Sequence, residues 1–192
     1  MTVIIRTPRL ELIRATVKIL ESDLHDKAEL ARRLHAEIPA AWPPPLMDEG
    51  VLCDFIRMCA DTRESAFSTW YWVRDEPGAG PRALVGCGGV LGTEGAADTV
   101  MLGYSVLDEF RNRGYATEAV CHLIPHFFTL PGIQRIAAAT YPELGASIRV
   151  LEKTGFAKTD LPLSGTGAGE GTVCYILEKP GENQAGTLIS SS

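Results

Sequence analysis

No two cysteines in this sequence stand at the Cys-x-x-Cys spacing of a zinc site or a redox motif. The five that occur are scattered, and most lie in apolar runs: Cys53, Cys59, Cys87, Cys121 and Cys174. An odd number without paired spacing gives no framework of disulfides. We therefore expect free thiols in a reducing, cytoplasmic setting, most of them buried.

A basic surface and a long apolar run are missing too. Aspartate and glutamate number 24 against 18 lysines and arginines, so the formal net charge is −6. This balance gives no cationic footprint for a nucleic acid. Apolar runs stay well short of the roughly 18 residues that cross a bilayer, and the N-terminus has no long apolar leader. We expect a cytoplasmic protein without nucleic-acid or membrane partners.

Ligand sets for a metal are also lacking. His122 and His126 stand one helical turn apart, but no third ligand is spaced near them, so we expect no metal. Glu94 and Asp98 flank predicted strands, where solvated turn charges are the ordinary interpretation. No general base is predicted from the sequence.

The chain does have the size and composition of one globular domain. It contains 192 residues, of which 45% are hydrophobic and 22% charged. We expect a single domain over residues 1–179. Residues 180–192 lack an apolar period and end in serines, which predicts a flexible C-terminal tail.

The clearest pattern is a strand, a turn and a helix within residues 101–120. The turn reads Arg111-Asn112-Arg113-Gly114-Tyr115-Ala116, and the next residues repeat an apolar side chain at helical spacing. A helix N-terminus has unpaired backbone N–H groups and a positive dipole, which favour an anion. Gly114 has no side chain to keep a ligand away, and two arginines flank it. A phosphate group is the expected ligand.

Apolar periods and turn residues predict the remaining elements. An opening strand is interrupted at Pro8, and a helix capped by Ser22 or Asp23 runs to Ile38. The other predicted helices are 48–59, 115–130 and 145–154, and the other strands are 67–74, 83–91, 98–106, 135–141, from 156 onward, and 172–178. This order predicts an α+β fold with a mixed, mostly antiparallel sheet of about seven strands and about four helices. Residues 165–171 are glycine-rich and predict a flexible loop.

Three stretches together resemble the GNAT N-acetyltransferases. Arg111-Asn112-Arg113-Gly114-Tyr115-Ala116 is similar to their R/Q-x-x-G-x-G/A acetyl-CoA motif. The stretches Thr7-Pro8-Arg9-Leu10-Glu11-Leu12 and Ser147-Ile148-Arg149-Val150-Leu151-Glu152-Lys153-Thr154-Gly155-Phe156 are similar to the RimJ and RimL subgroup of ribosomal-protein N-terminal acetyltransferases. The resemblance implies a three-layer α/β/α fold whose central sheet is splayed at the acetyl-CoA site.

The resemblance also implies a function. Acetyl-CoA would donate an acetyl group to a primary amine, either a protein N-terminus or a small molecule, by direct attack in a ternary complex. Backbone N–H groups of the turn would hold the pyrophosphate, and the preceding strand end would hold the pantetheine. The implied donor-site residues are Tyr104, Ser105, Val106, Arg111, Asn112, Arg113, Gly114, Tyr115, Ala116 and Thr117. A monomer or a homodimer is expected.

Two positions depart from the family pattern. Leu151 stands where many members have a tyrosine that protonates the leaving thiolate, and Leu144 stands where an asparagine usually contacts CoA. Ser147 matches the serine of the RimL-like branch and is our candidate proton donor, although a local helix-start hydrogen bond is an equal interpretation. The alternative function is a non-catalytic acyl-CoA-binding or sensing module.

The sequence indicates fewer residues of the acceptor site than of the donor site. Trp42 lies in the proline-rich segment Ala40-Ala41-Trp42-Pro43-Pro44-Pro45 and is predicted to form a wall of the acceptor pocket. Trp70 and Trp72 lie in a predicted strand, where core packing is expected.

Overall fold

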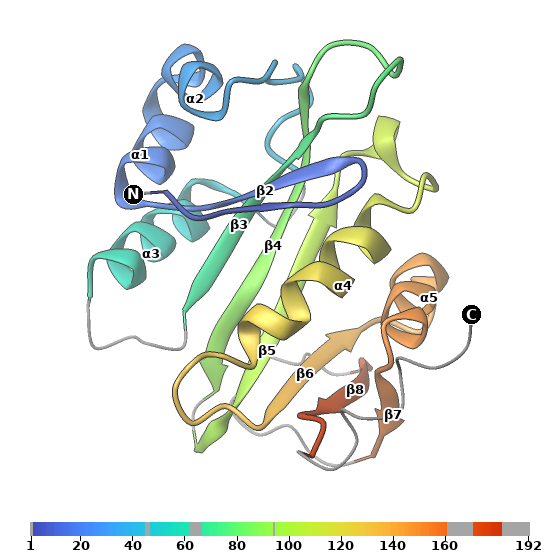
Figure 1. Ribbon diagram of the computed structural model, residues 1–192. Helices are drawn as coiled ribbons and strands as arrows, with labels where there is room; N and C mark the ends of the chain where they lie inside the picture. Colours follow the sequence, from blue (N-terminus) through green and yellow to red (C-terminus); the bar gives the residue numbers. More distant parts are fainter. Residues whose placement is uncertain (1, 45–46, 62–66, 94, 161–170, 182–192) are drawn as a thin grey trace.

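The structure, a computed structural model, describes residues 2–44, 47–61, 67–93, 95–160 and 171–181. Their strands form one mixed sheet in the order β1-β2-β3-β4-β5-β6-β8-β7 (Figure 1). Among these described strands, β5 and β6 form the only parallel pair. The strands are β1 (Ile4–Arg6), β2 (Leu10–Arg14), β3 (Ser68–Arg74), β4 (Ala83–Thr93), β5 (Ala96–Val106), β6 (Arg135–Thr140), β7 (Ala157–Thr159) and β8 (Val173–Glu178).

The mixed, mostly antiparallel sheet of the sequence prediction is confirmed, with eight strands instead of about seven. The extra strand arises at Pro8, where the opening segment turns back on itself and β1 pairs antiparallel with β2. Thr7 closes that turn, since its backbone N–H donates to the Leu10 carbonyl at 2.9 Å.

The described helices are α1 (Val17–His25), α2 (Lys27–Leu34), α3 (Glu49–Ala60), α4 (Tyr115–Phe127) and α5 (Gly145–Lys153), with a 3-10 turn, η1, at Asp108–Phe110. The single helix predicted to start at Ser22 or Asp23 is wrong. Thr16 caps α1, and Asp26 caps α2 from an extended backbone that interrupts the helical run. Ser22 and Asp23 instead lie buried within α1. The count therefore rises from about four helices to five.

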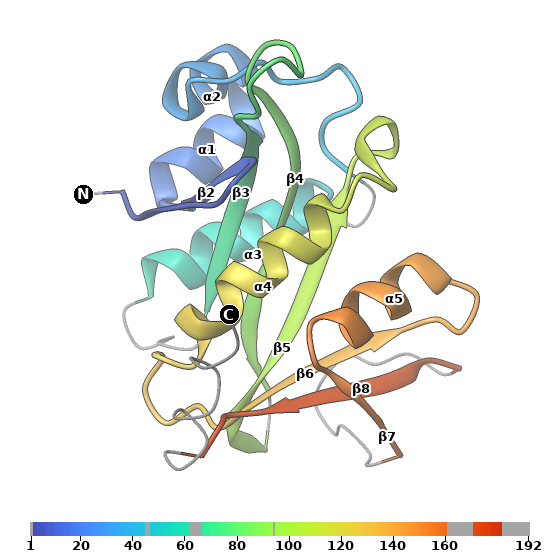
Figure 2. The ribbon, with the colours of Figure 1, turned by 45° about the vertical axis from the view of Figure 1, so that its right-hand side comes forward.

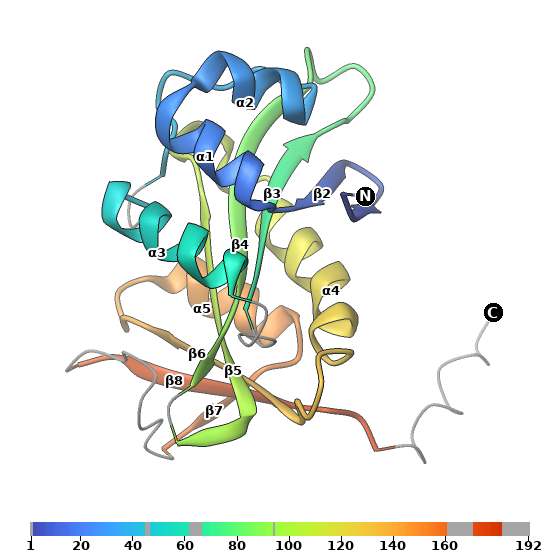
Figure 3. The same cartoon turned by 90° about the vertical axis from the view of Figure 1, so that its left-hand side faces the viewer.

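The helices cover the two faces of the sheet, which confirms three layers (Figure 3). Alternate side chains of a strand point to opposite faces. Trp70 of β3 contacts His126 of α4, with ring centroids 4.9 Å apart. The next residue, Tyr71, donates its hydroxyl hydrogen to Asp23 of α1 at 2.7 Å. Helices α4 and α5 thus share one face, and α1 and α3 lie on the other.

Glycines in β4 make room for an indole. A Cβ atom built on Gly88 would lie 2.6 Å from Cζ2 of Trp72, and one on Gly86 would lie 3.2 Å from Cε3 of the same ring. Trp72 is fully buried over these two residues. The glycine-rich sequence of β4 therefore lets a large core side chain lie close to the neighbouring strand.

The sheet opens between β5 and β6. These strands pair only at Thr99↔Arg135, Val100↔Ile136 and Met101↔Ala137. Beyond Met101, β5 stays paired with β4 as far as Val106, while β6 continues along β8. Figure 2 shows the two strands diverging. The edge of β5 from Leu102 to Val106 thus faces an opening, as a splayed sheet requires.

Candidate functional site

The turn between η1 and α4 presents free backbone donors. Asn112 and Gly114 adopt left-handed conformations, with φ of 60° and 82°. Gly114 is the N-cap of α4, and it has no side chain to cap the first turn. Among the described residues, no acceptor pairs with the backbone N–H groups of residues 112–117. A helix start of this kind suits an anion.

Arg9 braces this turn from the other end of the chain. Its Nη1 donates to the Arg113 carbonyl at 2.9 Å, and its Nε donates to Glu118 Oε2 at 2.7 Å. Its guanidinium also lies over the Tyr115 ring, 4.9 Å from the centroid. Thr7 adds a hydroxyl bond to Glu118 Oε1 at 2.5 Å. In the sequence this stretch shows a resemblance to the family but carries no signal of that role.

The Glu118 carboxylate is held in its charged form. Partial burial raises its pKa, but hydrogen bonds from Thr7 and from Arg9 outweigh burial and hold the pKa below its ordinary value. The contact of Arg9 with Glu118, called the brace below, therefore joins a charged carboxylate to a guanidinium at neutral pH.

The other residues of the turn fall into two groups. The Arg111 Nε donates to the Val106 carbonyl at 3.2 Å, and Arg113 Nη2 donates to the Glu109 carbonyl at 3.1 Å, so both cations stay beside the turn. Tyr115 is buried, and its hydroxyl donates to Glu76 at 2.9 Å. Its side chain is thus structural, and only its backbone can serve a ligand.

Two hydroxyls meet where the opening in the sheet reaches α5. The Tyr104 hydroxyl lies 3.0 Å from Ser147 Oγ and donates to the Ser147 carbonyl at 3.1 Å. Burial raises the pKa of Tyr104 to about 12, partly offset by its hydrogen bond to Ser147, so the phenol stays protonated at neutral pH. The sequence predicts Tyr104 as a residue of the donor site but does not reveal its side-chain bond, because the partner lies on a distant helix.

The two departures from the family pattern differ in their surroundings. Leu151 is buried in the core. Leu144 occupies the N-cap position of α5, makes no capping hydrogen bond and is 50% exposed.

Trp42 lies in the core. Its indole Nε1 donates to Asp23 Oδ1 at 2.8 Å, and its ring lies 5.8 Å from the Tyr71 ring. Lys27 also bonds the Asp23 carboxylate. Trp42 is absent from the described lining of a pocket that lies between α3 and strands β4 and β5. Its contact with an acceptor stays a prediction.

Asp98 is bonded to Arg135 at 2.6 Å, and Glu94 and most of residues 165–171 lie outside the described part of the chain. Within the described ranges, no group of three or more His, Cys, Asp or Glu is placed to hold a metal ion, and no helix is long and apolar enough to cross a membrane.

A comparison with protein families matches residues 9–157 to the Acetyltransferase (GNAT) domain. The chain belongs to this family. No curated protein matches it at a significant level.

Solved structures share the fold. Mycobacterium smegmatis RimJ in complex with CoA-disulfide is 24% identical, with a TM-score of 0.56 over 92% of this chain and 86% of that one. A RimL ribosomal L7/L12 α-N-protein acetyltransferase in complex with coenzyme A is 16% identical, with a TM-score of 0.61 over 92% and 98%. A putative ribosomal-protein-serine acetyltransferase from Vibrio cholerae is 19% identical, with a TM-score of 0.59 over 92% and 98%.

Proposed function

We propose that the protein transfers an acetyl group from acetyl-CoA to a primary amine, which attacks the thioester directly in a ternary complex. One observation carries the proposal: the unpaired N–H groups of the turn and the unpaired edge of β5 lie along one continuous stretch, residues 102–117. Membership of the GNAT family supports acetyl transfer. The solved RimJ and RimL structures, which are named as complexes of CoA, support the choice of donor.

The residues of the turn fit a pyrophosphate. A Cβ atom on Gly114 would project into the space beside Arg9 Nη2, at 3.3 Å, so glycine keeps that space open. Backbone N–H groups from Asn112 to Thr117, including that of Ala116, would donate to the phosphate oxygens. Arg111 and Arg113 would add positive charge after small side-chain rotations, because both are substantially exposed.

The parted edge of β5 fits the pantetheine. Among the strands that the structure describes, none pairs with Tyr104, Ser105 or Val106 on the side of β6. An extended chain with amide groups can bond to such an edge as an added strand does. A backbone N–H there would also stabilise the thioester oxygen as it gains charge.

Ser147 and Tyr104 would serve the leaving group. The donor supplies an activated acetyl group: its C–S bond breaks as the new C–N bond forms, and the amine releases a proton to solvent. The departing thiolate, whose acid has a pKa of about 8.5, takes a proton from Ser147 Oγ. Ser147 Oγ would regain a proton from solvent, and the Tyr104 hydroxyl, 3.0 Å from that oxygen, would hold it in place.

Binding and turnover should be measured separately. Calorimetry with acetyl-CoA tests the donor site, and mass spectrometry of a panel of peptides and small amines tests transfer. The panel includes peptides with ribosomal-protein N-termini, because several solved relatives are named for such substrates. Mass spectrometry is preferred to a thiol dye, since Cys53 and Cys121 are exposed and would react. Failure to bind acetyl-CoA would refute the proposal, whereas binding without any transfer would favour the sensing module.

A further inference from the structure

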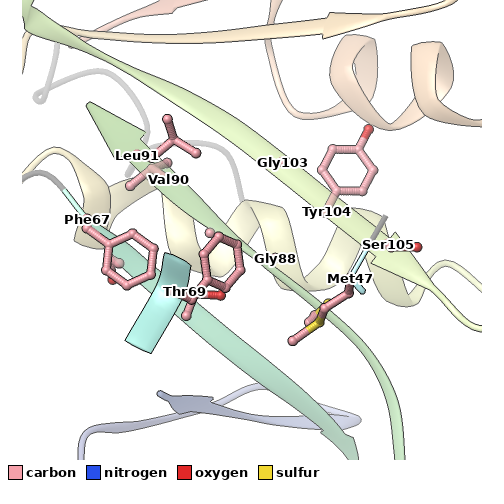
Figure 4. Close-up of a pocket in the computed structure, with 13 residues that line it drawn as sticks. Met47, Phe67, Thr69, Gly88, Val90, Leu91, Gly103, Tyr104 and Ser105 are labelled. Atoms are coloured by element: carbon pink, nitrogen blue, oxygen red, sulfur yellow. The ribbon is translucent and has the colours of Figure 1, made fainter. Parts of the chain in front are cut away.

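A pocket opens on the sheet face that carries α3, opposite α4 and α5 (Figure 4). Its floor is formed by β4 and β5, and its walls come from α3, from the segment before α3 and from β3. Tyr104 also lines the pocket, but its ring points away from Met47 and Phe67, toward the other face. The pocket and the Tyr104–Ser147 pair therefore lie on opposite sides of the same strand.

The floor is hollow because two glycines face each other. Gly89 of β4 pairs directly with Gly103 of β5. A Cβ atom on Gly89 would lie 2.1 Å from the Ser68 carbonyl oxygen, so that residue is required by packing. A Cβ atom on Gly103 would meet nothing within 4 Å, and its φ is not in the left-handed region. Gly103 thus leaves space that folding does not demand.

The walls are mostly apolar, although Ser68, Thr69 and Ser105 also line the pocket. Phe55 and Phe67 pack with ring centroids 5.3 Å apart on one side. Met47 lies on the other, with its sulfur 3.3 Å from Sγ of Cys87. Burial raises the pKa of the Cys87 thiol to about 12, so that group is uncharged at neutral pH. No charged side chain is present among the described lining residues.

The size of the pocket suits one side chain. Its volume is about 170 Å³. That equals roughly five or six water molecules at liquid density. A group of a few carbon atoms fills such a space, whereas a charged group would lose its hydration there without a partner.

The position of the pocket connects it with the reaction. Gly103 and Ser105 line it, and both belong to the stretch of β5 whose free edge faces the opening in the sheet. An amine that approaches a thioester in that opening from the α3 face must carry its neighbouring atoms over the pocket.

We propose that this pocket binds the group adjacent to the acceptor amine and selects an uncharged, apolar side chain of moderate size. The inference rests on the proposed acetyl transfer. It assigns Gly103 as a specificity-determining residue, because a larger residue there would occupy the space of the acceptor's side chain.

The test compares peptides that differ only in their first residue, with leucine, methionine, valine, alanine, aspartate or lysine. The wild-type protein should favour leucine, methionine and valine over aspartate and lysine by about tenfold or more in kcat/KM. Gly103→Val should lower kcat/KM about tenfold for the leucine peptide, less for the alanine peptide, and leave the Kd for acetyl-CoA unchanged. Ala97→Val, which adds the same side chain to an exposed site on β5, is the control.

Other outcomes would overturn the inference. A preference for charged first residues would do so, as would an equal loss for all peptides in Gly103→Val. If the wild-type protein does not bind acetyl-CoA, the proposed function is refuted instead. If no peptide is acetylated, the ¹³C-methyl signal of Met47, assigned with Met47→Leu, reports binding directly. Leucine peptides should shift this signal and aspartate peptides should not, and no shift with any peptide would reject the pocket assignment.

Discussion

Arg9 Nε and Glu118 Oε2 lie 2.7 Å apart, although 109 residues separate them in the chain. This contact joins the hairpin of β1 and β2 to the first turn of α4. The same guanidinium also donates a hydrogen bond to the Arg113 carbonyl. The turn that we propose binds phosphate is thus held in shape by a residue outside it. A preorganised site binds with a smaller loss of conformational entropy.

Loss of this brace should weaken donor binding. Arg9→Ala removes charge-assisted hydrogen bonds and should lower the free energy of unfolding by about 1.5–3 kcal/mol. It should also raise the Kd for acetyl-CoA about tenfold. Calorimetry and urea unfolding measure the two effects. Arg32→Ala, which breaks an exposed pair with Glu29 on α2, is the control and should change stability by less than about 1 kcal/mol. Unchanged affinity in Arg9→Ala would show that the turn keeps its shape alone.

The brace should also depend on pH. Because the pKa of Glu118 is lower in the folded protein than the ordinary 4.5, its contribution to stability is present above that value and is lost as pH falls through the lowered pKa. The free energy of unfolding of the wild-type protein should therefore converge on that of Glu118→Gln in acid. Between about pH 6 and 8 the difference should be constant. A difference that grew on acidification would contradict the direction of the shift.

Gly114 should resist substitution for two reasons. At a φ of 82° a side chain is strained by about 1–3 kcal/mol, and a Cβ atom would also crowd Arg9. Gly114→Ala should thus lose both stability and acetyl-CoA affinity, and Gly114→Trp should abolish binding. Gly78 offers a matched control, since its φ is 81° and a Cβ atom there meets nothing within 4 Å. Gly78→Ala should lose stability alone. Equal affinity in both alanine variants would reject the phosphate site.

Ser147 should affect turnover more than binding. Ser147→Ala removes the proposed proton donor, and kcat should fall by about 10²-fold while the Kd for acetyl-CoA stays near its wild-type value. Tyr104→Phe should lower kcat by a smaller factor, because it removes the group that holds the donor. Single-turnover kinetics on both variants provides the measurement. A Ser147→Ala variant with an unchanged rate would leave Ser147 a local role in α5.

Trp42 can be tested apart from its packing. Trp42→Phe keeps an aromatic ring but removes the hydrogen bond to the Asp23 carboxylate, at a cost of about 1.5–3 kcal/mol in stability. If Trp42 also contacts the acceptor, as the sequence predicts, KM for the amine should rise while the Kd for acetyl-CoA does not. A change in stability with constant KM would confine Trp42 to the core.

The secondary structure around the turn was predictable because it is local. The strand, turn and helix around Gly114 are contiguous in the sequence, so periodicity and one glycine are enough to place them. Distant pairs left no such signal: Glu118 reads as an ordinary surface residue of a helix until the fold brings Arg9 to it. Gly103 likewise reads as one more strand glycine.

The errors have the same physical origin. Asp23 looks like a helix cap because short polar residues favour that position, yet its carboxylate is stabilised inside α1 by Tyr71 and Trp42. Those partners come from β3 and from the segment after α2. Local propensity cannot report a tertiary bond of this kind.

The short pairing of β5 with β6 has a mechanical consequence. Strands β6, β7 and β8 are joined to the rest of the sheet by a ladder that spans only Thr99 to Met101 of β5. The two parts of the sheet are therefore connected at one end and separate at the other. A molecule that forms hydrogen bonds with the backbone along the free edge of β5 would stiffen the connection between the two parts of the sheet. The two parts of the sheet would then be held more rigidly while the proposed donor is bound and less rigidly after it leaves.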